Sequence, residues 1–344
     1  MISQVRTWLI SICVMVTLMV VIGGVTRLTG SGLAITDWAP IMGAIPPLSD
    51  SDWQTTFAKY QATPQYLKVN EGMPLSEFKF IFFWEYFHRL VGRSIGLVVL
   101  VPMFFFWRRK KIDRSLIKKV LFGFALGGLQ GFLGWFMVKS GLIDNPAVSH
   151  FRLAAHLVLA LFILGYFTWL VCGYSWVNST TSPAPPGMIR NFRIVKTLIL
   201  IQIIYGAFVA GLKAGWAFNT FPKMAGEWIP GNLWVMAPTW VNAFENPATV
   251  QWIHRWIGVM ILIGTPLVAL QIKKSQGFSH SKRWGMGLKH MIYIQFLLGV
   301  FTLVLKVPLA LGVLHQLGAA IIIVILTALS HALKHESLST SKGG

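Results

Sequence analysis

Histidines inside apolar segments are the residues of this chain best suited to carry chemistry. His88, His156, His254 and His315 each fall near the start of a separate hydrophobic segment. An ionisable side chain within a bilayer is costly, so it marks an ion pathway, a proton relay or a cofactor ligand. Imidazole is a ligand for iron, copper and zinc. The four histidines therefore indicate two sites, each with a pair of histidine ligands for a metal ion or a haem.

A short sequence frame around two of these histidines recurs along the chain. Residues 85–92 read Glu-Tyr-Phe-His-Arg-Leu-Val-Gly, and residues 251–258 read Gln-Trp-Ile-His-Arg-Trp-Ile-Gly. His156 and His315 each lie two hydrophobic segments further on. Two weaker correspondences share one spacing: Gly24 corresponds to Gly206, and Pro40 corresponds to Pro222. Such self-similarity is typical of an internal repeat.

Eight hydrophobic segments position these residues, in a chain that is 55% hydrophobic and only 12% charged. Runs of about twenty apolar residues are long enough to cross the ~30 Å hydrocarbon layer of a bilayer as a helix, and only the seventh segment is shorter. The segments are 8–28, 81–106, 120–138, 153–173, 195–216, 251–271, 291–306 and 312–332. We therefore predict an all-α integral membrane protein with eight transmembrane helices, arranged as two tandem four-helix-bundle repeats of the same orientation.

The repeat and the composition between its copies predict the domain boundaries. Residues 1–173 form the N-terminal four-helix repeat with the first histidine pair. Residues 195–344 form the C-terminal repeat with the second pair. The stretch 174–194 between them contains the run TTSPAPPG and is expected to be a cytoplasmic linker.

The distribution of charge predicts orientation and excludes a nucleic-acid-binding protein, despite a formal net charge of +19. Basic residues gather in alternate loops: Arg108, Arg109, Lys110, Lys111, Arg114, Lys118 and Lys119; Arg190, Arg193 and Lys196; Lys273, Lys274, Lys282, Arg283 and Lys289. Nearly all acidic residues lie in the intervening loops. This positive-inside pattern predicts cytoplasmic termini and outward-facing loops at 29–80 and 217–250. A nucleic-acid-binding protein would gather its basic residues on one soluble face.

The location of the histidines follows from this orientation. All four lie early in spans that run inwards, about 5–12 Å below the outer surface.

The first span is longer than the apolar core of a signal peptide, and the short segment before it favours a bacterial plasma membrane protein. Cys13 and Cys172 lie towards the cytoplasmic side, where we expect them to pack rather than form a disulfide.

Haem explains the histidine pairs better than a bare metal ion. Each repeat offers only two histidines and no carboxylate-rich shell, and small residues beside them would let a flat macrocycle approach the backbone. A single histidine in a membrane helix is as often a packing residue as a ligand, but recurrence of the pair favours ligation. The other histidines, His150, His280, His290, His331 and His335, lie at loops or span ends, where we expect solvent exposure. Of these, His150 is the main competitor of His156.

Glu85 and Gln251 distinguish the two repeats. Each lies three residues before a histidine, so both side chains share the helix face of that histidine. A glutamate can exchange protons, whereas a glutamine cannot. We therefore expect chemistry in the first repeat, with Glu85 as its catalytic residue, and electron transfer in the second. The alternative is that Glu85 only forms an ion pair with Arg89. Arg89, Arg255 and Arg152 are candidate partners of haem propionates, although Arg89 and Arg255 could also snorkel.

Taken together, these features resemble haem A synthase over nearly the whole chain. The resemblance is carried by the ExxHR and QxxHR frames, the GGVTRLTGSGL run that leads to Trp38 and Pro40, and the HQxGAA run from His315. The chain lacks the outer-loop cysteine pair of some members, and in this it resembles the proteobacterial and mitochondrial branch.

The resemblance implies an oxidoreductase of haem biosynthesis that makes the cofactor of terminal oxidases. The ring methyl of haem O would be hydroxylated twice, with oxygen from water, to give the formyl group of haem A. His254 and His315 would bind the iron of a resident haem b, near Gln251 and Arg255. His88 and His156 would flank the iron of the substrate haem, near Arg89 and Arg152. Expected partners are the membrane lipid, the farnesyltransferase that makes haem O, and oxidase assembly factors.

Two other classes of protein remain as alternatives. A di-haem b-type electron-transfer protein would usually stack its haems at different depths, whereas these histidines share one leaflet. A haem-binding transporter or chaperone would more often have inverted repeats with helices broken at the midplane. The electron acceptor and the oligomeric state are not indicated by the sequence.

Overall fold

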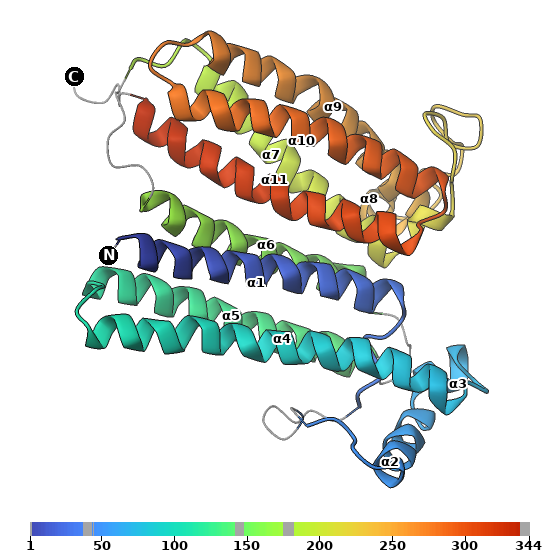
Figure 1. Cartoon of the computed structure of the whole chain (residues 1–344). Coiled ribbons are helices and arrows are strands. Elements are labelled where there is room, and N and C mark those ends of the chain that lie inside the picture. Colours follow the sequence, from blue (N-terminus) through green and yellow to red (C-terminus); the bar gives the residue numbers. More distant parts are fainter. Residues whose placement is uncertain (1, 37–42, 44, 142–147, 175–181, 338–344) are drawn as a thin grey trace. The chain divides into compact units, whose positions relative to one another are not determined.

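The computed structural model describes residues 2–36, 43, 45–141, 148–174 and 182–337. Trp38 and Pro40, and residues 175–181 of the predicted linker, lie outside these ranges. The described residues form helices α1 (Ile2–Leu28), α2 (Asp50–Gln61), α3 (Pro64–Val69), α4 (Leu75–Arg108), α5 (Arg114–Gly141), α6 (His150–Gly173), α7 (Met188–Gly211), η2 (Ala214–Trp216), η3 (Thr239–Val241), α8 (Asn242–Glu245), α9 (Pro247–Lys274), α10 (Ser279–Val304) and α11 (Leu309–Glu336) (Figure 1).

The all-α prediction is confirmed: the described residues contain no β-strand, and eight helices are long and apolar enough to cross a membrane. These are α1, α4, α5, α6, α7, α9, α10 and α11. Their outward faces carry large exposed apolar side chains, among them Leu97, Phe132 and Leu267. Such faces suit a lipid solvent and would be a liability in water.

Several helix ends differ from the predicted spans. The α4 and α9 helices begin before the predicted starts at residues 81 and 251. The added turns of α4 contain polar residues, and α9 starts earlier because Asn246 caps it with Pro247 in the first turn. The predicted span 195–216 is too long at its end: α7 stops at Gly211, and Lys213 adopts a left-handed conformation before η2. Similarly, α10 ends at Val304, and Lys306 and Val307 have positive φ angles.

The chain divides into two compact units. The first unit comprises Val14–Ile163, and the second comprises Met1–Cys13 with Leu164–Gly344. In the first unit, α4 packs against α5, and Thr26 on α1 donates a hydrogen bond to the carbonyl oxygen of Trp84 on α4 (3.4 Å). The paired contacts described below are consistent with a tandem repeat.

Two short helices, α2 and α3, cover one end of α4 in the first unit. Ser49 caps α2 by accepting a bond from the N–H of Asp52, whose carboxylate accepts from the N–H of Ser49. Thr63 caps α3, with Pro64 in its first turn. Between α2 and the start of α4 lies a small, mostly aromatic core, formed by Ala34, Phe57, Tyr60, Phe78, Ile81 and Phe82.

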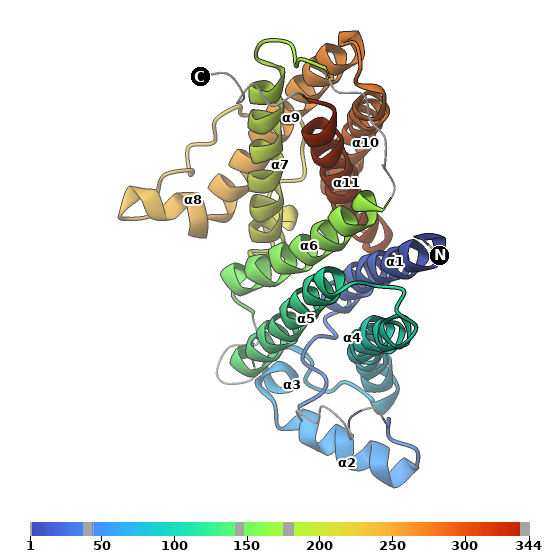
Figure 2. The ribbon, with the colours of Figure 1, turned by 90° about the vertical axis from the view of Figure 1, so that its left-hand side faces the viewer.

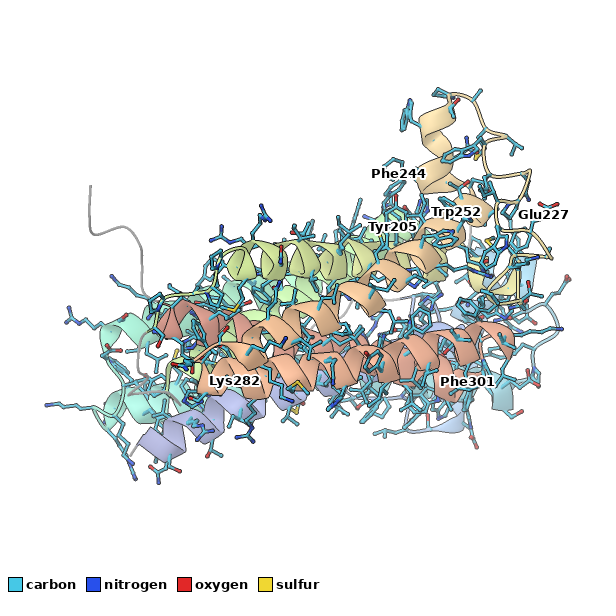
Figure 3. The ribbon with its side chains drawn as sticks, turned by 90° about the horizontal axis from the view of Figure 1, so that it is seen from above. Tyr205, Glu227, Phe244, Trp252, Lys282 and Phe301 are labelled. Atoms are coloured by element: carbon cyan, nitrogen blue, oxygen red, sulfur yellow. The ribbon has the colours of Figure 1, made fainter. Side chains whose placement is uncertain are left out.

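In the second unit, α7, α9, α10 and α11 form one bundle, with α8 standing out to the side of α7 and α9 (Figure 2). Its core is mostly aliphatic and includes Ile199, Ile261 and Leu326. Figure 3 shows Lys282 at one end of this bundle and Glu227 and Trp252 at the other. The basic and acidic loops of this unit therefore lie at opposite ends.

Candidate haem-binding sites

The four predicted histidines fall in pairs, one pair in each unit. His88 on α4 and His156 on α6 belong to the first unit, and His254 on α9 and His315 on α11 to the second. Within each pair the two imidazoles are close enough to interact electrostatically. All four side chains are half-buried rather than sealed in a core. The structure thus brings together the residues that the sequence predicted to be partners.

A glycine on a neighbouring helix faces each imidazole. A Cβ atom added to these glycines would lie 3.2 Å from His88 Nε2 at Gly23, 3.2 Å from His156 Cε1 at Gly134, 3.2 Å from His254 Cε1 at Gly206 and 2.9 Å from His315 Cε1 at Gly299. Those distances are too short for an unstrained contact. A larger residue at Gly299 would therefore force the imidazole or the helix to move, and at the other three glycines the imidazole would have to give way by a few tenths of an ångström.

Three glutamines hold the backbone of three histidines. The Nε2 amide groups of Gln130, Gln202 and Gln295 donate to the carbonyl oxygens of His156 (3.0 Å), His254 (2.9 Å) and His315 (2.9 Å), respectively. Each glutamine lies four residues before the glycine that faces the same histidine. Sequence reasoning missed these residues, although the spacing Gln-x-x-x-Gly recurs in three spans and was available as a signal. It had also paired Gly24 with Gly206, whereas Gly23 contacts His88.

Unsatisfied polar atoms remain at these three positions. Among the described residues, the Nδ1 atoms of His156, His254 and His315 are buried without a hydrogen-bond partner. The same holds for the Oε1 atoms of Gln130, Gln202 and Gln295. Buried polar atoms are normally paired, so this recurrent deficit points to a component that the protein binds there.

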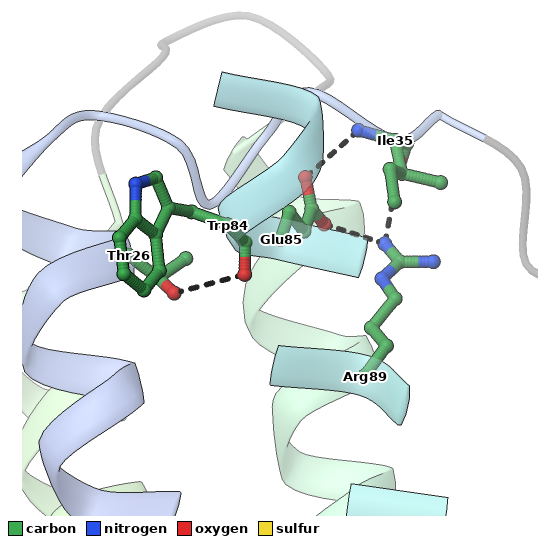
Figure 4. A network of polar contacts seen from close by, with 5 residues as sticks. All are labelled: Thr26, Ile35, Trp84, Glu85 and Arg89. Carbon is green, nitrogen blue, oxygen red and sulfur yellow. Dashed lines mark hydrogen bonds and ion pairs between the residues drawn. The ribbon is translucent and has the colours of Figure 1, made fainter. Parts of the chain in front are cut away.

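Glu85 joins α4 to the segment that follows α1 (Figure 4). Its side chain is 3% exposed. One carboxylate oxygen accepts a hydrogen bond from the Arg89 guanidinium at 2.7 Å, and the other accepts from the backbone N–H of Ile35 at 2.8 Å. Arg89 also donates to the Ile35 carbonyl oxygen at 3.0 Å. The ion pair named as an alternative therefore exists, and Ile35 is a third partner.

Gln251 makes the corresponding connection in the second unit with opposite polarity. Its Nε2 group donates to the carbonyl oxygens of Ala214 (2.8 Å) and Phe218 (3.3 Å), in the segment that follows α7. Its Oε1 atom accepts from Arg255 at 3.0 Å. The segment after α1 presents an N–H group, which suits a carboxylate. The segment after α7 presents carbonyl groups, which suit an amide.

The remaining site candidates differ in their surroundings. The Arg152 guanidinium stacks on the Phe136 ring, 4.6 Å from its centroid. Arg255 donates to the carbonyl oxygens of Phe218 and Thr220.

The expectation of solvent exposure was wrong for two of the other histidines, because the side chains of His150 and His331 are only 7% and 3% exposed.

The outlying histidines pack against aromatic rings. The His331 ring lies 4.8 Å from the Trp169 ring and 4.3 Å from the His335 ring, and the His150 ring lies 4.1 Å from the Phe151 ring. Cys13 and Cys172 are not joined in a disulfide. The Cys13 Sγ atom lies 3.8 Å from the Thr168 hydroxyl.

Comparison with known proteins gives relatives over almost the whole chain. A protein named haem A synthase from Nitrosospira multiformis is 44% identical over 337 residues, which cover 97% of this chain and 94% of the relative. One of that name from Nitrosomonas eutropha is 46% identical over 319 residues (92% and 89%). Another, from Flavobacterium johnsoniae, is 43% identical over 339 residues (96% and 98%).

The family comparison covers both histidine pairs. The profile of the cytochrome oxidase assembly protein family (COX15-CtaA) matches residues 6–327, a range that includes every histidine, glutamine and glycine of the two sites. The extent of this match and the identity to the three relatives lead to one assignment: the chain belongs to the cytochrome oxidase assembly protein family.

Proposed function

We propose that this protein is a haem A synthase, which oxidises the ring methyl group of haem O to a formyl group. The observation that carries the proposal is the presence of two glycine-faced histidine pairs, one beside the buried carboxylate of Glu85 and the other beside the neutral Gln251. The relatives named haem A synthase, at 43–46% identity, support it.

The residues of both sites fit haem better than a metal ion held by protein alone. Within the part of the chain that the structure describes, no group of three or more His, Cys, Asp and Glu side chains is placed to hold a metal. A haem supplies four nitrogen ligands itself, so a pair of histidines completes its iron. The glycines leave room for the imidazoles, and a ligated histidine has an Nδ1–H group to place, consistent with the buried Nδ1 atoms.

The two units take different roles in this proposal. His88 and His156 flank the iron of the substrate haem O in the first unit, with Arg152 towards its propionates. His254 and His315 ligate a resident haem b in the second unit, near Gln251 and Arg255. A haem held by these two histidines would supply one-electron redox chemistry to the site.

The overall reaction needs both a negative group and a route for electrons. Conversion of a methyl to a formyl group adds one oxygen atom from water and releases four electrons and four protons. The Glu85 carboxylate, fixed by Arg89 and the Ile35 N–H group, stabilises positive charge that develops at the methyl carbon and accepts a released proton. Gln251 can do neither, which suits a site that only transfers electrons.

The proposed location is the bacterial plasma membrane. Both termini face the cytoplasm, and the haem sites lie towards the outer face. The separation of Lys282 from Glu227 to opposite ends of the second unit supports this orientation (Figure 3). An intramembrane site also suits the apolar farnesyl tail of haem O. The enzyme that makes haem O and oxidase assembly factors are the proposed partners.

Pigment extraction from the purified protein tests the proposal. When the protein is produced in cells that make haem O, we expect haem b together with haem A or hydroxylated haem O in the extract. Haem b alone would favour a b-type electron-transfer protein. Absence of any haem from folded protein would contradict both redox functions.

A further inference from the structure

The fourth histidine lacks the hydrogen bond that holds the other three. The Met19 methyl carbon lies 3.3 Å from where a Cβ of Gly92 would be, and the Gln202 amide nitrogen lies 3.2 Å from where a Cβ of Gly258 would be. Gly92 and Gly258 each lie four residues after a site histidine, His88 or His254. Met19 therefore takes the place of the glutamine. A thioether donates no hydrogen bond, and no side chain in the described residues donates to the His88 carbonyl oxygen.

The His88 ring also has a different orientation. At the other three sites the Cε1 atom of the imidazole is closest to the facing glycine. At Gly23 the closest atoms are Nε2 (3.2 Å) and Cδ2 (3.6 Å) of His88. A half-turn of the ring exchanges Nε2 with Cε1 and Cδ2 with Nδ1. The His88 ring thus lies in the same place as its counterparts but turned over.

We propose that Gln130, Gln202 and Gln295 are positioning residues for fixed haem ligands, and that Met19 makes His88 the exchangeable ligand of the four. Three histidines are tied at their own carbonyl groups to a neighbouring helix. The His88 imidazole, without that tie, turns over and withdraws so that the first unit can admit a haem and release it. The second unit, with both histidines tied, retains its haem.

This inference rests on the proposed function, because it requires haem in both units. It explains an asymmetry that the reaction needs: a substrate must leave, whereas a resident cofactor must not. The buried Oε1 atoms of the glutamines add to the argument. Each of these glutamines thus keeps an unused acceptor at a site whose histidine is already held at its carbonyl oxygen, and a methionine offers no such acceptor.

Exchange of the two side chain types between units provides the test. Methionine and glutamine have similar lengths, so Met19→Gln and Gln202→Met alter hydrogen bonding more than packing. The purified full-length proteins are loaded with haem b in detergent and mixed with excess apomyoglobin, which captures released haem. Haem transfer is followed by absorbance, and the CO-binding fraction of the reduced protein is measured in parallel.

We expect biphasic haem transfer from the unmodified protein. Met19→Gln should slow the fast phase about five-fold, the factor of one buried hydrogen bond, and reduce CO binding. Gln202→Met should accelerate the slow phase by a similar factor and leave the fast phase unchanged. Met19→Leu, which adds no hydrogen bond, is the matched control and should behave like the unmodified protein. A purely structural role of position 19 would not make haem binding tighter.

Two results would overturn the inference while leaving the proposed function intact. One is a loaded Met19→Gln protein that releases haem at the unmodified rate. The other is a single release rate for both haems in the unmodified protein. Failure of folded protein to load haem in either unit would instead refute the proposed function, and the inference with it.

Discussion

Glu85 and Gln251 occupy matching positions in the two units and bind backbone groups of opposite polarity. Glu85 accepts a hydrogen bond from the N–H group of Ile35, whereas Gln251 donates to the carbonyl oxygen of Ala214. Each also accepts from the arginine four residues later. The difference between the two residues thus has a structural reason as well as the proposed chemical one, and substitutions can separate these.

Glu85→Gln tests the chemical role. A glutamine can still accept a hydrogen bond from Ile35, so we expect a folded protein with an unchanged haem b content. Its rate of haem A formation should fall about 100-fold or more, since a neutral amide neither accepts a proton nor stabilises a cation. Turnover per bound haem b is the measurement. Full activity in a correctly loaded variant would reduce Glu85 to a partner of Arg89.

Gln251→Glu tests the structural role from the other side. A carboxylate there would face the carbonyl oxygens of Ala214 and Phe218 and lose both hydrogen bonds that the amide donates. We expect a loss of about 1–3 kcal/mol in stability, seen as a lower Tm in detergent. Gln251→Met, which removes the same bonds without adding charge, is the control and should be less destabilising. A Gln251→Glu protein that is at least as stable as the unmodified protein would contradict the assigned polarity of this contact.

Gly299→Ala tests the close approach of His315. The added methyl group would lie 2.9 Å from the imidazole, so the ring or the helix must move. We expect a destabilisation of about 1–3 kcal/mol and a lower haem b content. Gly287 lies on the same helix with nothing within 4 Å of an added Cβ, so Gly287→Ala should retain its haem. The account fails at this position if both variants retain haem equally.

The cap of α2 predicts a pH dependence outside the membrane. The Ser49 hydroxyl, with the N–H groups of Ser49 and Leu48, holds the pKa of Asp52 below its ordinary value. The ionised carboxylate therefore stabilises the start of α2 at neutral pH. This contribution is lost as the pH falls below about 4, the ordinary value of an aspartate.

A spin label on the exposed Thr55 reports this change. Its mobility should increase on acidification of the parent protein, whereas Asp52→Asn should be mobile already at pH 7. The parent at neutral pH serves as the immobile reference. Identical spectra for the two proteins at pH 7 would show that the Asp52 carboxylate does not hold α2.

The sequence predicted the positions of the spans and the four candidate histidines because both signals are local: hydropathy marks a span, and an ionisable residue within a span is costly. Helix ends were less predictable: α10 begins at Ser279 with a polar turn that no hydropathy window contains. The helices α2 and α3 were missed although Ser49 with Asp52, and Thr63 with Pro64, are readable start signals. The Glu85–Ile35 bond was not predictable, because Ile35 contributes only its backbone, and contacts of a backbone group leave no trace in residue type.

The most direct test of the central claim is haem analysis of membranes from cells in which the gene for this protein has been deleted. Our account predicts that haem O accumulates, haem A is absent, and the unmodified gene restores haem A, whereas a His156→Ala copy does not. Haem A at normal levels in the deleted strain, with no second gene for the same activity, would contradict it.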